Sequence, residues 1–114
     1  ESGEISNQRV FVHSDERDGV PDGMTVDAEG CVWSAHWGGN CVIRYTPEGV
    51  EERRIYLPAN QVSCVTFGGD DYADMYITTA GGHRKAELGE GSGALYPLRL
   101  GIRGLPEFRS RIGL

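Results

Sequence analysis

Asp22 is the residue of this sequence whose type and position best suit catalysis. It lies between Pro21 and Gly23. A carboxylate can bind a hard divalent cation through oxygen, and it can also accept a proton from an attacking water. The alternative is structural, because an aspartate before a glycine often caps a turn by hydrogen bonding to its own backbone. The local residues alone leave both roles open.

His36 and Trp37 are candidate substrate-binding residues. They open the segment His36–Asn40, which we expect to connect two strands, and such loops carry function more often than strands do. The alternative assigns Trp37 to packing and leaves His36 in solvent. Gly81–Ser92 is a second, longer connection, which could form a rim or lid over a site or remain a plain exposed loop.

Other patterns do not support a site. Gly89–Ala94 fits a dinucleotide-binding G-x-G-x-x-A string, but no apolar strand precedes it and a predicted strand follows it. Asp15–Gly19 is acidic but lacks the spacing of an EF-hand calcium loop. The cysteines Cys31, Cys41 and Cys64 form no C-x-x-C pair, which favours free, buried thiols in a reducing, cytoplasmic compartment.

Composition and charge exclude several classes of partner. The 114 residues carry a formal net charge of −6, and 39% of them are hydrophobic, which is enough for the core of one domain. Acidic residues and arginines are interspersed without a basic stripe, which argues against nucleic acid. No apolar run approaches the roughly 20 residues of a membrane-spanning helix, so we expect no membrane partner.

Short β-branched and aromatic runs alternate with clusters of Gly, Asp, Pro and Asn, and helical patterns are absent. This alternation predicts an all-β fold. Hairpin turns are expected at Asp27–Gly30, Thr46–Gly49 and Gly68–Asp71, where glycine supplies a positive φ. The predicted strands are Arg9–His13, Met24–Asp27, Cys31–His36, Cys41–Thr46, Glu52–Leu57, Ser63–Phe67, Met75–Thr79, Ala94–Leu100 and Phe108–Ile112.

The chain repeats itself, since Val26–Trp33 is echoed by Phe67–Tyr76. A period of about 40–45 residues with four strands per unit is typical of β-propeller blades. We divide the chain into an outer strand of a preceding blade at residues 1–13, one blade at 22–58 and the last blade at 61–112. Two blades do not close a ring, so we expect assembly with the N-terminal part of the same propeller or with copies of this chain.

The repeat bears on Asp22 as well. Its counterpart in the second unit is Ser63. A carboxylate that every blade required would recur, so the absence of one at Ser63 indicates a role specific to one blade. Trp33 and Tyr76, in contrast, match at corresponding positions, and we expect both to be buried between blades.

Several segments match family motifs in order along nearly the whole chain. They are Pro21–Gly30 (P-D-G-M-x-x-D-x-E-G), Trp33–Gly39 (W-x-A-x-x-G-G), Val42–Gly49 (V-x-R-Y-x-P-x-G), Thr66–Gly69 with Met75–Ala80 (F-G-G followed by L-Y-I-T-T-A), and the closing strands from Gly93 to Pro106. In these segments the chain resembles the senescence marker protein, gluconolactonase and luciferin-regenerating enzyme family.

The resemblance implies a six-bladed β-propeller, of which this chain would supply about the last two blades plus one strand. It also implies a metal site at the mouth of the central channel, and it maps one metal ligand and the general base onto Asp22. The other protein ligands would lie upstream of residue 1. Calcium or zinc is the expected ion, with magnesium or manganese as alternatives.

The expected function is therefore metal-dependent hydrolysis of a small, sugar-type lactone, as in gluconolactonases. One alternative is a catalytically inactive propeller fragment that acts only through assembly. Another is a phosphotriesterase-like hydrolase, which rests on analogy between folds alone.

Overall fold

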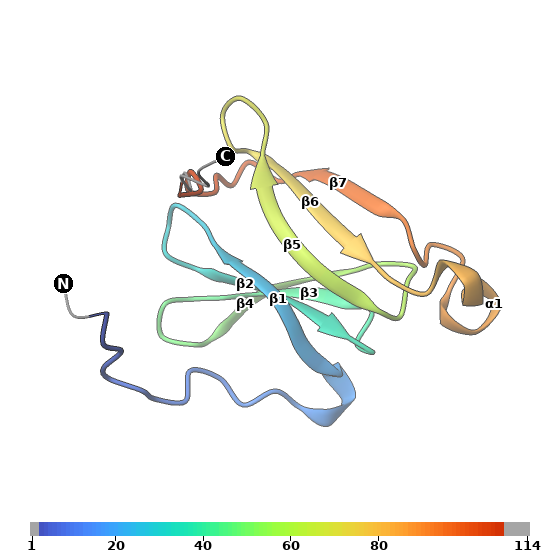
Figure 1. The fold of residues 1–114 in the computed structure, drawn as a ribbon, viewed down its shortest axis with the longest axis horizontal. Helices are drawn as coiled ribbons and strands as arrows, with labels where there is room; N and C mark the ends of the chain where they lie inside the picture. Colours follow the sequence, from blue (N-terminus) through green and yellow to red (C-terminus); the bar gives the residue numbers. More distant parts are fainter. Residues whose placement is uncertain (1–2, 109–114) are drawn as a thin grey trace.

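A computed structural model describes residues 3–108 and contains two antiparallel β-sheets (Figure 1). The first sheet has the strand order β1-β2-β3-β4, and the second has the order β5-β6-β7. The all-β prediction is confirmed. The strands are β1 (Val20–Val26), β2 (Val32–Trp37), β3 (Cys41–Tyr45), β4 (Glu51–Tyr56), β5 (Val62–Gly68), β6 (Asp74–Thr79) and β7 (Leu95–Arg99).

The predicted turns connect these strands where glycine permits a positive φ. Gly30, Gly49 and Gly69 have φ values of 80°, 83° and 79°, a region that other residues rarely adopt. Most strand bounds differ from the prediction by one or two residues. The largest difference is at β1, which begins at Val20 instead of Met24. Asp22 therefore lies inside a strand and not in the loop before it.

The N-terminal segment passes beside the first sheet without joining it. Arg9–His13, predicted as a strand, has no strand pairing in the structure. Phe11 instead makes an edge-to-face ring contact with Tyr45 of β3, with centroids 6.4 Å apart. The assignment of residues 1–13 to a preceding blade remains a prediction, because its pairing partners would lie outside this chain. The predicted strand Phe108–Ile112 extends beyond the described residues.

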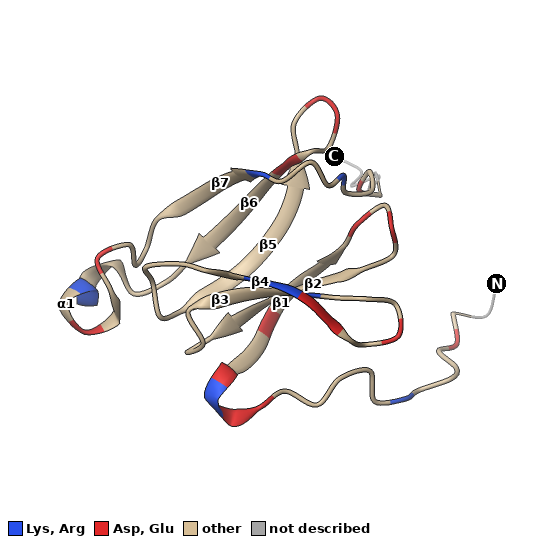
Figure 2. Cartoon of the chain, turned by 180° about the vertical axis from the view of Figure 1, so that it is seen from behind, with Lys and Arg blue, Asp and Glu red and all other residues tan. Residues whose placement is uncertain are grey.

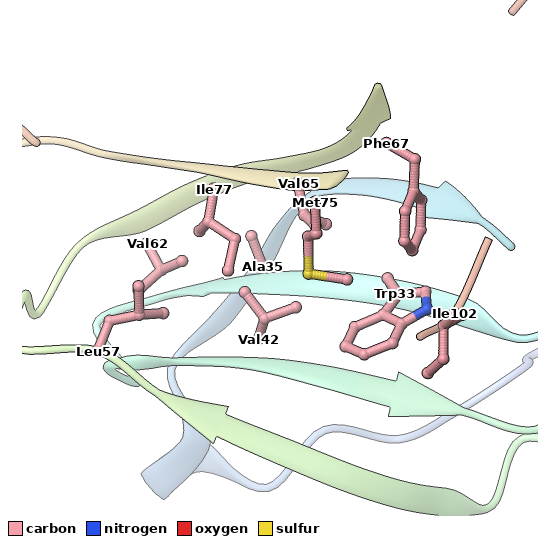
Figure 3. Packing of buried hydrophobic residues seen from close by; sticks show 10 residues of the cluster. All are labelled: Trp33, Ala35, Val42, Leu57, Val62, Val65, Phe67, Met75, Ile77 and Ile102. Carbon is pink, nitrogen blue, oxygen red and sulfur yellow. The ribbon is translucent and has the colours of Figure 1, made fainter. Parts of the chain in front are cut away.

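The main core fills the space between the two sheets (Figure 3). Trp33 of β2 is fully buried there, and its ring meets Phe67 of β5 edge to face at 6.1 Å. The predicted burial of Trp33 is confirmed. The fully or nearly buried residues of this core are Trp33, Ala35, Val42, Leu57, Val62, Val65, Phe67, Met75, Ile77 and Ile102.

Equivalent strand positions differ in exposure, depending on whether another sheet covers them. Val65 and Phe67 of β5 face the first sheet and expose only 2% and 6% of their surface. Met24 and Val26 occupy the matching positions of β1 and expose 60% and 40%. The exposed face of the first sheet at Met24 and Val26 therefore corresponds to the face of the second sheet that is buried against a neighbouring sheet. Such stacking of similar antiparallel sheets fits part of a β-propeller.

Tyr76 lies on the opposite face of β6 from the core and is half-buried. The corresponding face of the first sheet carries Trp33, which packs against the second sheet. The burial expected for Tyr76 would need a further sheet on this side, so that part of the prediction stays open.

The connection between β6 and β7 is a long exposed segment with two short helical turns. It contains a 3-10 turn at Gly82–Arg84 and the one-turn helix α1 at Lys85–Leu88. The backbone N–H of Asn60 donates to the carbonyl of Leu88 at 2.6 Å, which ties this segment to the linker between the sheets. Residues 82–87 are exposed, which agrees with the expected exposed loop, although the loop contains these short helical turns. No helix within residues 3–108 is long and apolar enough to cross a membrane.

Candidate active site

Asp22 lies at a β-bulge in the innermost strand of the first sheet. Pro21 pairs with His36 and Met24 with Ser34, so β1 carries one residue more than β2 between these pairs. Bulges are common next to active sites because they redirect a side chain. Asp22 is exposed, and within residues 3–108 its carboxylate has no hydrogen-bond or ion-pair partner. It therefore caps no turn and is free to bind a ligand or a proton.

Gly23 explains how the neighbouring strands come so close to Asp22. A Cβ atom at Gly23 would lie 2.8 Å from the Cα atom and 2.6 Å from the Sγ atom of Cys64 on β5. No side chain fits at this distance. The glycine that follows Asp22 thus permits β1 and β5 to pack side by side at the level of the candidate site.

The three cysteines do not share one environment. Cys31 and Cys41 are buried as predicted, and burial raises the pKa of both thiols above the ordinary value. Cys64 is exposed, which corrects the prediction for this residue. The reason is its place on the innermost strand β5, where its neighbour in β1 is Gly23, a residue with no side chain to cover the thiol.

An ion-pair cluster holds the segment that leads into β1. Arg54 of β4 donates to both carboxylate oxygens of Asp18, at 2.9 Å for Nη2 to Oδ2, and its Nε donates to Glu51 at 3.0 Å. The hydrogen bonds from Arg54 keep the pKa of Asp18 below its usual value. Since Asp18 is four residues before Asp22, this cluster fixes the path by which the chain approaches the bulge.

His36 is fully buried, so in this structure it does not reach solvent. Its Nδ1 donates to the backbone oxygen of Asp18 at 3.0 Å, while Nε2 has no partner among the described residues. Burial lowers the pKa of the imidazole. The ring lines a cavity of about 310 Å³, together with Phe11 and Tyr45, between the first sheet and the N-terminal segment. Strand alternation gives the reason, because His36 shares this covered face with Ser34.

Trp37 lies at the end of β2 and exposes 39% of its surface. It forms an isolated bridge with Gln61, just before β5. Gly38 next to it donates through its backbone N–H to the carbonyl of Asn60 at 3.0 Å. Trp37 therefore lies where the two sheets meet, at the end of the sheets where β1 begins, and it remains available to a ligand.

Sequence reasoning missed a buried polar cluster at the other end of the first sheet. Asp27 is fully buried, and its Oδ2 accepts hydrogen bonds from Trp33 Nε1 and Arg44 Nε, both at 2.8 Å. Arg44 also contacts Glu29 and Glu52. The signal was present in the motifs, which place a carboxylate, a tryptophan and an arginine in neighbouring segments of the first unit. Because Asp27 is fully buried and both of its carboxylate oxygens accept hydrogen bonds, the cluster stabilises the hairpin and is not a reaction site.

Acidic segments mark the hairpin turns of the first sheet and the approach to β1, with basic residues scattered between them (Figure 2). Even so, the described residues contain no group of three or more His, Cys, Asp or Glu side chains that could hold a metal ion. The exposed carboxylate of Asp22, free of protein partners, suits one oxygen ligand of a hard cation. The chain therefore fits part of such a site.

Comparison with known proteins identifies relatives over most of the chain. Residues 1–81 match the family model described as the SMP-30/gluconolactonase/LRE-like region. Pentonolactonase XacC of Haloferax volcanii is 45% identical over 121 aligned residues, which include 100% of this chain and 42% of the relative. L-arabinolactonase of Azospirillum brasilense is 44% identical over 78 residues, covering 68% of this chain and 25% of the relative.

The fold is also similar to that of a solved structure. The crystal structure of a calcium-binding protein, regucalcin, from Agrobacterium tumefaciens superposes with a TM-score of 0.78 at 29% identity, covering 88% of this chain and 35% of that one. The chain thus spans less than half the length of the proteins that it matches. The ordered motifs, the stacked sheets and these comparisons together show that the chain belongs to the SMP-30/gluconolactonase/LRE-like family.

Proposed function

We propose that the protein to which this chain belongs hydrolyses a small sugar-type lactone, and that Asp22 is both a metal ligand and the general base. The observation that carries the proposal is the exposed carboxylate at a strand bulge, which has no partner in the described part of the chain and follows from packing that requires Gly23. The names of the relatives support the substrate class, because pentonolactonase and L-arabinolactonase act on sugar lactones.

In the proposed reaction, Asp22 accepts a proton from the water that attacks the lactone carbonyl. It then returns this proton to the ring oxygen as the carbon–oxygen bond breaks, so that lactone and water give a hydroxy acid. A bound divalent cation would polarise the carbonyl and lower the pKa of the attacking water. Trp37 is the candidate substrate contact at the same end of the sheets. We assign the buried His36 to packing, since it does not reach solvent.

The proposal places the missing ligands outside this chain. Asp22 alone leaves a hard cation held mainly by water, and affinity rises with the number and charge of the protein ligands. We therefore propose that the site is completed by the N-terminal part of the same propeller. In that arrangement the two sheets are the last two blades of a six-bladed ring, with residues 1–13 as an outer strand. Calcium or zinc remains the proposed ion.

The test replaces Asp22 by asparagine in the complete protein. Asp22→Asn keeps the size of the side chain but removes the charge and the base, so we expect lactone turnover to fall by about 10²–10⁴-fold. Asp70→Asn is the matched control, because Asp70 is exposed in the turn between β5 and β6. Turnover and metal content are measured on the same samples with pentonolactones as substrates. Near wild-type turnover in Asp22→Asn with metal retained would refute the mechanism.

A further inference from the structure

Ser63 is the structural counterpart of Asp22 in the second sheet. Val62 pairs with Thr79 and Cys64 with Thr78, so Ser63 is an extra residue of β5 and forms a bulge. The bulge of β1 has the same form, with one additional residue at Asp22. Ser63 therefore occupies the position from which, in the preceding sheet, the candidate catalytic carboxylate projects.

The two bulges lie at the same level of neighbouring strands. Figure 1 shows β1 and β5 beside each other and running in the same direction. Gly23 follows Asp22, and Cys64 follows Ser63. These two following residues pack against each other, since a Cβ atom added to Gly23 would lie only 2.8 Å from the Cα atom of Cys64. Because both strands advance in parallel from this contact, Asp22 and Ser63 are neighbours across the junction between the sheets.

Ser63 is one half of a hydroxyl pair. Its Oγ lies 2.9 Å from Oγ1 of Thr78 on β6, and either oxygen can donate. Ser63 is half-buried, and neither side chain has another partner among the described residues. Thr78 is exposed in this chain but shares the face of β6 that carries Tyr76, which a further sheet would cover in the proposed ring, so Ser63 is the member of the pair that would face the ligand, at the bulge position that matches Asp22. One O–H donates within the pair, so the other O–H and the remaining lone pairs are free. A group that both donates and accepts, such as an alcohol, satisfies this arrangement.

We infer that the Ser63–Thr78 hydroxyl pair binds a ring hydroxyl of the lactone, next to the carbonyl at which Asp22 acts. This inference rests on the proposed function. It assigns substrate selection to the second sheet and proton transfer to the first. A hydroxylated sugar lactone then gains a hydrogen bond that an unsubstituted lactone cannot make.

The test compares two substrates in the complete protein: a pentonolactone, and γ-butyrolactone, which has no ring hydroxyl. We expect Ser63→Ala and Thr78→Val to lower kcat/KM for the pentonolactone by about two- to tenfold, the effect of one lost neutral hydrogen bond. Hydrolysis of γ-butyrolactone should stay unchanged. Thr78→Ser keeps the hydroxyl and should behave as wild type. Thr66→Val is the control, because Thr66 is an exposed threonine on β5, the strand of Ser63, without a side-chain hydrogen bond among the described residues.

Binding supplies a readout that does not depend on turnover. Calorimetric titration with the corresponding pentonic acid should show weaker binding to Ser63→Ala and Thr78→Val than to wild type. Equal losses for both substrates, or unchanged pentonolactone kinetics and acid binding in both variants, would overturn the inference while leaving lactonase activity intact. A wild-type protein that hydrolyses neither lactone would overturn the proposed function, and the inference with it. If Ser63→Ala does not fold, Thr78→Val and Thr78→Ser still decide the question.

Discussion

The buried cluster around Asp27 gives the most quantitative prediction. In Asp27→Asn, the backbone N–H groups of Glu29 and Cys31, at 2.9 and 3.0 Å, keep the carbonyl oxygen on their side. The new amide N–H₂ then faces two donors, Trp33 Nε1 and Arg44 Nε. Both donors lose their acceptor in a site without solvent.

Each buried donor left without a partner costs about 1–3 kcal/mol. Two such donors give about 2–6 kcal/mol, and the remaining contacts of Arg44 with Glu29 and Glu52 favour the lower part of this range. We therefore expect Asp27→Asn to lower the free energy of unfolding by about 2–4 kcal/mol.

The assay is urea denaturation of the complete protein, followed by tryptophan fluorescence and analysed by linear extrapolation. Asp70→Asn makes the same chemical change at an exposed turn, and its effect should stay within about 0.5 kcal/mol of wild type. Both variants lose one negative charge, so their difference isolates the buried cluster. An Asp27→Asn protein as stable as Asp70→Asn would refute the idea that this cluster stabilises the hairpin.

Three further predictions follow from the same structure. Gly23→Ala places a Cβ atom 2.8 Å from the Cα atom of Cys64, so it should separate β1 from β5 and reduce both Tm and lactone turnover, whereas equal values in both assays would contradict the close packing. Burial lowers the pKa of His36, so the unfolded chain binds a proton more readily than the folded chain does; the neutral imidazole therefore contributes its full stability above the ordinary pKa of about 6.5, and this stability is lost as the pH falls through the folded pKa. Between pH 7.5 and 5.5, Tm should fall more in the wild type than in His36→Gln, as measured by thermal unfolding. The chain of residues 1–114 alone, with Asp22 as its one proposed ligand, should bind calcium or zinc with a Kd weaker than about 10⁻⁴ M by calorimetry, and it should associate in solution by sedimentation. A monomer that holds stoichiometric metal would contradict the shared site.

The fold could be predicted from local signals because turn chemistry and strand propensity agree along the chain. Glycines at Gly30, Gly49 and Gly69 place the hairpins, and the strands between them follow. The bulge at Asp22 could not be predicted in the same way, because it depends on how β1 pairs with β2 and not on the residues of β1 alone. Pro21 and Gly23 on either side of Asp22 favour a turn, whereas tertiary packing makes this segment a strand.

In the candidate site, the sequence indicated Asp22 but not the surroundings of His36 and Ser63. The residue type and the motif of Asp22 indicated chemistry, and its exposed carboxylate has no partner within residues 3–108, which is compatible with a ligand role. The environment of His36 depends on Asp18, which is distant in sequence, so its burial had no local signal. The pairing of Ser63 with Thr78 was likewise hidden, because the repeat shows Ser63 only as a position where the carboxylate is missing.

The stacking of the two sheets also restricts how copies of this chain can associate. The face of the first sheet that carries Trp33 receives the face of the second sheet that carries Phe67, so the contact joins two different surfaces. A two-fold dimer would place like surfaces against each other and could not reproduce this contact. Copies that repeat it must follow one another head to tail, which is a heterologous arrangement that ends in a closed ring or continues as a helix. The rotation between neighbouring sheets therefore selects between a finite assembly and an open filament.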